Sequence, residues 1–260
     1  MSQPVLLTFE GGIARLTLDR PDDGNALTAE ASKSIGLAVD AIAAEPGVRV
    51  VVLAGNGPMF CAGGNIKEFV EVGDRVADLI GDELVHLNKT LVKLAGLPQP
   101  VIASLHGAVA GGGIGLALTS DVAIGAQSLR FRAGYPAIGL SPDAGTSFHL
   151  TRLIGPMRTK EFLFTNRFID APEALALGLV TRVVPDAELA AETTALAERI
   201  ASLSAGSHAA VKKLVAAAGT SSLPDVLALE REHMIRNAAQ PDCREGIEAF
   251  LERRRPAFAG

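Results

Sequence analysis

The stretch VIASLHGAVAGGGIGLAL, residues 101–118, contains the clearest indication of the fold. It opens with a run of apolar and β-branched residues, passes through a glycine-rich loop, and closes with a short apolar segment. Ser104, His106 and five glycines within the same stretch argue against a membrane span. We therefore predict a buried strand, a glycine loop and a short helix, which is a unit typical of α/β proteins.

Strands and helices continue to alternate on both sides of this stretch. Further strands are predicted over residues 14–18, 48–54 and 121–126, and helices over 28–43, 68–97 and 114–119. Such alternation predicts a mostly parallel sheet whose strand-end loops form the binding face. From about Ala190 onward only helices are predicted. We interpret residues 1–195 as an α/β core and residues 196–260 as a helical C-terminal segment, which either caps the core or packs between subunits.

Composition and charge argue against several classes of function. With 24 Lys and Arg against 29 Asp and Glu, the chain has no basic excess of the kind that binds nucleic acid. Its two cysteines, Cys61 and Cys243, form neither a disulfide framework nor a metal-ligand spacing. The first residues lack a basic region followed by a long apolar run, so we predict no signal peptide. We expect a cytoplasmic protein without a metal, nucleic acid or membrane as partner.

Two glycine loops follow predicted buried strands, at residues 55–67 and 106–113. Glycine lets a ligand approach the backbone closely and leaves N–H groups free to point at it, although glycine also serves simply to let strand and helix pack tightly. Neither loop has the GxxxxGK pattern that cradles phosphate, and the run from Gly111 to Gly115 lacks the GxGxxG spacing of dinucleotide sites. The two loops together favour a ligand held by backbone donors.

Four motifs occur in a fixed order along the chain: residues 25–27 (NAL), 60–67 (FCAGGNIK), 107–113 (GAVAGGG) and 139–146 (GLSPDAGT). In this order they resemble the motifs of the crotonase (enoyl-CoA hydratase/isomerase) superfamily, and the similarity extends over essentially the whole chain. The resemblance implies a crotonase-type spiral of ββα units followed by a helical oligomerisation segment. It also implies assembly as a homotrimer or as a hexamer built from two trimers.

The resemblance further implies an acyl-CoA thioester as substrate, with coenzyme A as part of that substrate and no permanently bound cofactor. The backbone N–H groups of Gly64 and Gly112 would polarise the thioester carbonyl, since fixed donors stabilise the negative charge that develops on its oxygen. Other positions correspond to residues that line coenzyme A or the acyl group in the family, namely Ala26, Ala62, Asn65, Ile66, Lys67 and Tyr135. A lone exposed lysine is also commonly just solvated, so Lys67 is open to either interpretation.

The chain departs from the family pattern at two positions that decide which reaction it can catalyse. Hydratases of this family use two glutamates, and this chain has Gly115 and Tyr135 at those positions, so simple hydration is doubtful. Asp143 is the carboxylate that remains. An Asp beside Pro and Gly can simply satisfy turn amides, but family members with an Asp at this place use it on the acyl group.

The carboxylate of Asp143 allows two chemistries. In isomerases like the phenylacetyl-CoA epoxide enzyme it moves a proton between acyl carbons, and in the related dehalogenase it attacks the ring as a nucleophile. Where the dehalogenase has a base histidine and a stacking tryptophan, this chain has Asn88 and Tyr135. We therefore predict an isomerase in which Asp143 shuttles the proton and Tyr135 shapes the acyl pocket. The alternatives are an enoyl-CoA hydratase, a dehalogenase-like hydrolase, and a non-catalytic acyl-CoA-binding protein.

Overall fold

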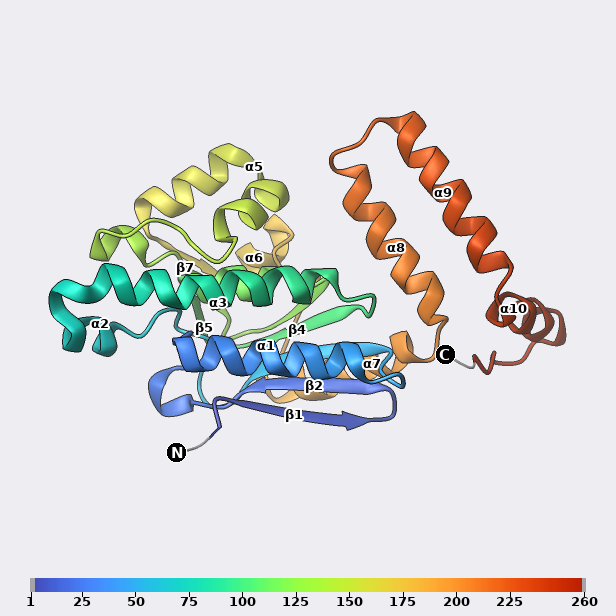
Figure 1. The fold of residues 1–260 in the computed structure, drawn as a ribbon, viewed down its shortest axis with the longest axis horizontal. Helices are drawn as coiled ribbons and strands as arrows, with labels where there is room; N and C mark the ends of the chain where they lie inside the picture. The colour runs from blue at the N-terminus through green and yellow to red at the C-terminus, as the bar shows by residue number, and fades with distance from the viewer. Residues whose placement is uncertain (1–2, 259–260) are drawn as a thin grey trace.

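The computed structural model describes residues 3–258, which form an α/β core and a helical extension (Figure 1). The main sheet has the strand order β1-β2-β3-β4-β6-β9, in which β1 and β2 are antiparallel and the remaining neighbours are parallel. Its strands are β1 Val5–Glu10, β2 Ile13–Leu18, β3 Val50–Gly55, β4 Val101–Leu105, β6 Val122–Ala126 and β9 Arg182–Val184. A smaller sheet has the order β5-β7-β8, with β5 Ala108–Ala110, β7 Arg130–Arg132 and β8 Phe168–Asp170.

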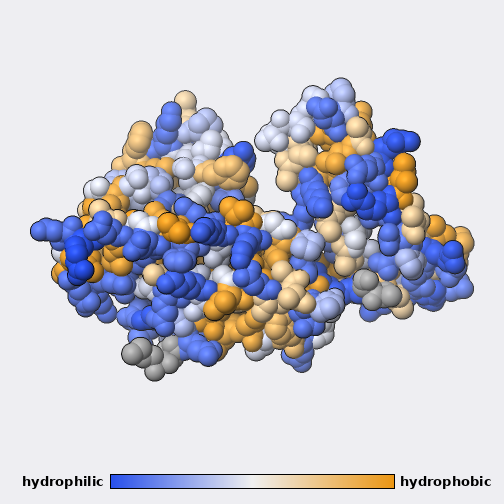
Figure 2. Space-filling model, viewed as in Figure 1, coloured by the Kyte–Doolittle hydropathy of each residue, from blue (hydrophilic) through white to orange (hydrophobic). Residues whose placement is uncertain are grey.

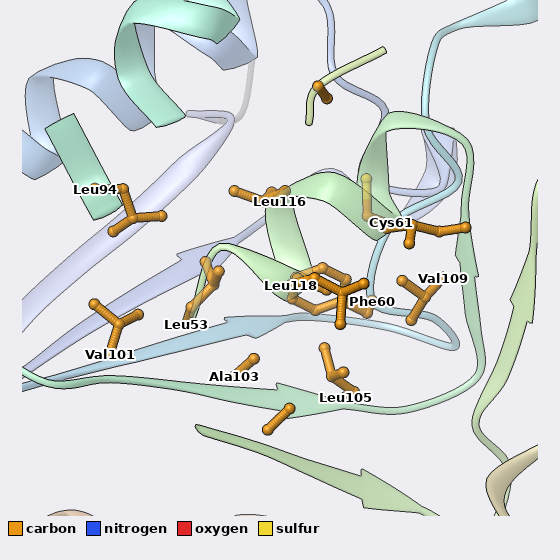
Figure 3. Packing of buried hydrophobic residues seen from close by; sticks show 14 of the residues in the cluster. Leu53, Phe60, Cys61, Leu94, Val101, Ala103, Leu105, Val109, Leu116 and Leu118 are labelled. Atoms are coloured by element: carbon orange, nitrogen blue, oxygen red, sulfur yellow. The ribbon is translucent and has the colours of Figure 1, made fainter. Parts of the chain in front are cut away.

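Strand β3 is apolar throughout and β4 has one polar residue, Ser104, because both faces of the main sheet are buried. In β3, Val51 and Leu53 pack into one hydrophobic cluster, whereas Val50 and Val52 pack into a second cluster on the other face. Figure 3 shows part of the first cluster, to which Leu53 and Phe60 both belong. Successive residues of a strand point to opposite faces, so this division follows directly from the extended backbone.

Helices α1 Ala29–Ala44 and α3 Val76–Gly96 cover the first face and pack against each other. Thr28 caps α1, with its hydroxyl accepting from the N–H of Ala31 at 3.2 Å. The single helix predicted over residues 68–97 is wrong. The chain instead forms α2 Ile66–Val72, a 3₁₀ turn at Gly73–Arg75, and then α3. Gly73 has φ +55° and ψ −122°, a conformation that a residue with a Cβ rarely adopts and that ends the first helix.

Two of the remaining helices of the core, α4 Gly112–Leu118 and α6 Ala171–Leu177, contact the smaller sheet at β5 and β8, and α5 Thr146–Thr165 packs against α4. The short helix α4 follows β5 directly and therefore begins two residues earlier than predicted. Beyond a 3₁₀ turn at Tyr135–Ile138 lie α5, which kinks at Gly155 before Pro156, and α6. No helix within residues 3–258 is long and apolar enough to cross a membrane.

Helix α7 Leu189–Ala201 covers the second face of the main sheet, where Leu189 and Ala197 are buried against β3, β4 and β6. The predicted boundary at residue 195 falls inside this helix, and residues on both sides of the boundary pack on the sheet. The helices that extend away from the core are α8 Ala205–Ala218, α9 Leu223–Ala238 and α10 Pro241–Glu252 (Figure 1). The break between core and extension therefore comes after α7.

Candidate active site

Asn25 fixes the first glycine loop at the end of β3. Its side-chain amide donates to the backbone carbonyls of Asn56, Met59 and Phe60 at 2.9, 3.0 and 3.1 Å, and its Oδ1 accepts from the N–H of Arg20 at 2.8 Å. Asn25 itself has φ +54°, a conformation that Asn tolerates better than most residues. One buried asparagine thus determines the path of the loop that leads to Gly64.

The two glycine loops meet backbone to backbone. The N–H of Ala110 donates to the carbonyl of Cys61 at 2.9 Å, and the N–H of Leu27 donates to the carbonyl of Gly63 at 2.8 Å. A Cβ on Gly63, which has φ +89°, would lie 2.8 Å from the carbonyl oxygen of Ala110 and 3.3 Å from the nitrogen of Gly112. Glycine at position 63 is therefore what allows the loop of Gly64 to lie against the loop of Gly112.

Gly64 and Gly112 line the same cavity of about 600 Å³. Within residues 3–258, neither the N–H of Gly64 nor that of Gly112 donates a hydrogen bond. Most of the other lining side chains are apolar, and they include Leu27, Phe69 and Leu87. Two free backbone donors in an apolar cavity of this volume match the requirements of a site for a small carbonyl-containing ligand.

Asp143 lies beside these donors and is held by Tyr135. The hydroxyl of Tyr135 donates to Oδ1 of Asp143 at 2.7 Å and lies 3.2 Å from the hydroxyl of Thr146. A Cβ on Gly112 would lie 3.0 Å from the same Oδ1. Burial raises the pKa of Asp143, and the hydrogen bond from Tyr135 opposes the rise. Burial and the charge of Asp143 also raise the pKa of Tyr135, so its hydroxyl remains a donor.

A carbonyl held by the two donors would therefore have a carboxyl group next to it, which is an arrangement suited to moving a proton beside that carbonyl. Comparison with known proteins identifies the family, because the model of the enoyl-CoA hydratase/isomerase family matches residues 8–260. The chain belongs to the enoyl-CoA hydratase/isomerase family. The resemblance to the crotonase superfamily and the predicted crotonase-type α/β fold are thereby confirmed.

Relatives in this family carry both hydratase and isomerase names. A Rhodobacter capsulatus protein described as a probable enoyl-CoA hydratase is 36% identical over 96% of this chain and 95% of its own length. The 1,2-epoxyphenylacetyl-CoA isomerase of Escherichia coli is 31% identical over 100% of both chains. The crystal structure of an enoyl-CoA hydratase from Bacillus anthracis is 30% identical and superposes with a TM-score of 0.94 over 99% of this chain and 100% of that chain.

The structure brings some of the predicted substrate-binding residues of this hydratase/isomerase family member to the cavity and places others elsewhere. Ala62, Ile66 and Tyr135 line the cavity together with Gly64, Gly112 and Asp143. Asn65, Ala26 and Lys67 are not among the lining residues. Asn65 instead caps α2, with its Oδ1 accepting from the N–H groups of Lys67 and Glu68 at 3.1 and 3.4 Å.

Ala26 is buried, at 4% exposure, and its backbone carbonyl accepts from the N–H of Thr28 at 3.1 Å. Lys67 is 79% exposed along its side chain, and its Nζ lies 3.9 Å from an oxygen of Asp23. The exposure of Lys67 fits the solvated interpretation, and a contact of its ammonium group with coenzyme A stays a prediction.

Gly115 and Tyr135 stand at the two positions where the resemblance predicts the hydratase glutamates. A Cβ on Gly115 would lie 1.9 Å from the carbonyl oxygen of Ala144, so no larger side chain fits there without a backbone shift. Tyr135 occupies the second position, and its hydroxyl donates a hydrogen bond to Asp143. Asn88, at the position where the resemblance to the dehalogenase predicts a base, lines the cavity and supplies an amide rather than an imidazole.

Glu83 of α3 is the site residue that the sequence reasoning missed. It lines the cavity, is only 5% exposed, and within residues 3–258 its Oε1 has no hydrogen-bond partner. Burial raises the pKa of Glu83 to about 7, and repulsion from Glu68 and Asp143 adds to the rise. Its helical spacing could have revealed it, because Glu83 lies on the same face of α3 as the buried residues Leu87, Leu91 and Leu94.

Proposed function

We propose that this member of the enoyl-CoA hydratase/isomerase family is an acyl-CoA isomerase in which Asp143 moves a proton along the acyl group. The observation that carries the proposal is the position of Asp143, whose Oδ1 is held by Tyr135 at 2.7 Å beside the oxyanion glycine Gly112. The absence of room for a glutamate at Gly115 supports isomerisation over simple hydration. The similarity to the E. coli 1,2-epoxyphenylacetyl-CoA isomerase supports the same choice.

In the proposed reaction, the thioester oxygen accepts hydrogen bonds from the N–H groups of Gly64 and Gly112. Loss of a proton from the carbon next to the carbonyl places negative charge on that oxygen, and each fixed donor is worth roughly 3–4 kcal/mol there. Asp143 accepts the proton, and its raised pKa brings its basicity closer to the working pH. Coenzyme A takes part only as the carrier of the acyl group, and the proposal requires no permanently bound cofactor.

Replacing Asp143 with Asn tests this function because it removes the base and leaves the shape of the side chain unchanged. We expect kcat to fall by about 10²–10⁴-fold while acyl-CoA affinity stays within a few-fold. Asp82→Asn, at an exposed position of α3, makes the same change in charge and should leave both quantities unchanged. Turnover by Asp143→Asn at the wild-type rate would refute the proposal.

Activity measurements on a panel of acyl-CoA substrates distinguish the isomerase from the hydratase, the dehalogenase and the non-catalytic binder. Isomerisation of a 3-enoyl-CoA increases the absorbance of the conjugated thioester, whereas hydration of a 2-enoyl-CoA decreases it. An epoxide of an aromatic acyl-CoA tests for a ring isomerase, and release of halide from a halobenzoyl-CoA tests for a dehalogenase. Tight binding of every thioester without turnover by the wild-type protein would favour the non-catalytic binder.

We also propose that the chain assembles as a homotrimer or a hexamer through its helical extension. Large apolar side chains of α8, α9 and α10 are exposed, among them Val215 at 68%, Met234 at 72% and Phe250 at 82%. Figure 2 shows apolar surface on this extension beside the core. Exposed apolar side chains gathered on one part of a molecule mark a surface that gains free energy by contact with another chain. Measurement of the molecular mass in solution tests this assembly.

A further inference from the structure

Glu83 belongs to α3 and brings a second carboxyl group into the cavity that Gly64 and Gly112 line. Asp143 reaches the same cavity from the loop before α5. Glu83 is 5% exposed, and no described residue donates to its Oε1. A buried carboxyl oxygen without a partner costs free energy, and such groups are rare in folded proteins. Because this oxygen belongs to a residue that lines the cavity shared by Gly64 and Gly112, the partner missing at Oε1 is best explained as a ligand or a transferable proton.

The charged groups near Glu83 do not neutralise it. Glu68 of α2 and Asp143 repel its negative form, and only the backbone N–H of Ala29, at the start of α1, favours that form. In the part of the chain that the structure describes, no Lys, Arg or His contributes to the pKa of Glu83. With its pKa raised to about 7, the carboxyl is protonated in a large fraction of molecules at neutral pH.

Building on the proposed isomerase function, we propose that Glu83 is a second proton-transfer group of the site, acting on the acyl group together with Asp143. The two carboxyl groups come from different elements, and Tyr135 holds Asp143 by its Oδ1 next to Gly112. Asp143 is thereby fixed near the carbon beside the carbonyl, whereas Glu83 serves a carbon further along the acyl chain.

The two steps balance for a 3-enoyl thioester. The C2–H bond breaks, its proton goes to Asp143, and its electron pair spreads through the double bond and the carbonyl as a dienolate. The Glu83 O–H bond then breaks and its proton forms the new C4–H bond, while the double bond settles between C2 and C3 and the carbonyl is restored. Asp143 ends protonated and Glu83 ends ionised, so the return of one proton through solvent resets the site.

Isomerisation of a 3-enoyl-CoA in D₂O tests the assignment through the label and the rate. With wild type and the control Asp82→Asn, we expect solvent deuterium at C4 of the product. In Glu83→Gln, kcat should fall by about 10²-fold or more with KM within a few-fold, and the residual product should retain the substrate hydrogen, since Asp143 then acts alone. Because Glu83 acts as the acid, its loss should also remove the basic limb of the pH profile near neutral pH.

Glu83→Asp retains a carboxyl group and should keep the basic limb, which distinguishes proton transfer from a purely structural role. Turnover, label and pH profile of Glu83→Gln identical to those of wild type would overturn the role of Glu83 and leave the isomerase function intact. Absence of any turnover by wild type would overturn the isomerase function, and this role with it.

A titration that needs no turnover tests the pairing of the two carboxyl groups. In protein labelled with ¹³C at the glutamate carboxyl carbons, the signal missing from Glu83→Gln identifies Glu83. Its midpoint should lie well above that of exposed glutamates, and Asp143→Asn should lower it by removing a negative charge that faces it. A midpoint that does not move would overturn the pairing.

Discussion

Replacing Glu83 with Gln should stabilise the folded protein at alkaline pH and have little effect at acidic pH. The cause is burial, because Glu83 is 5% exposed and its negative form faces Glu68 and Asp143, with no cation among the described residues that act on it. Glutamine has nearly the same shape and carries no charge. The substitution therefore removes the cost of holding a buried negative charge while it changes the packing of the cavity little.

The size and sign of the change in stability follow from the pKa of Glu83. In the folded protein the pKa of Glu83 rises from 4.5 to about 7, so between these values the folded state binds more protons than the unfolded state. The stability of wild type should therefore fall as pH rises through this window, and the loss should be complete above it. At about 1.4 kcal/mol for each pH unit, the full effect is roughly 3 kcal/mol, an upper value because the buried amide of Gln also lacks partners.

Equilibrium unfolding in urea at pH 4.5 and pH 8.5, at one fixed protein concentration, measures this difference. We expect wild type and Glu83→Gln to differ little at pH 4.5, and the variant to be the more stable by up to roughly 3 kcal/mol at pH 8.5. Asp82→Asn controls for the loss of one negative charge from α3 and should follow wild type. An advantage of Glu83→Gln that is the same at both pH values, or a variant less stable than wild type at pH 8.5, would refute the reasoning.

Tyr135→Phe should raise the pKa of Asp143 further, because it removes the hydrogen bond that opposes the effect of burial. The acid limb of kcat/KM should move to higher pH, and a limb in its wild-type position would contradict the proposed contact. Light scattering should give a mass of three or six chains for the wild-type protein. Phe250→Asp, which adds a charge to an exposed apolar side chain of α10, should lower that mass, whereas a monomeric wild type would contradict the assembly.

Much of the fold could be predicted because its signals are local or periodic. The largely apolar runs of β3 and β4 predict buried strands, since a strand covered on both faces favours apolar side chains at nearly every position. Ser104 of β4 is the exception, and its hydroxyl accepts a hydrogen bond from that of Thr193. Asp143 could be singled out because the motif around it is contiguous in sequence. The break between α2 and α3 at Gly73 was missed, because an isolated glycine within a helical pattern does not reveal its φ angle.

The sequence by itself determined the family, the two glycine loops and the carboxylate of Asp143, because each is written in a short continuous motif. The tertiary structure alone decided that Tyr135 holds Asp143, that Gly115 excludes a glutamate, and that Glu83 reaches the same cavity. These relations depend on distances between α3, α4 and the loop before α5. A carboxyl group becomes chemically distinctive only when the fold removes water from it and places other charges beside it.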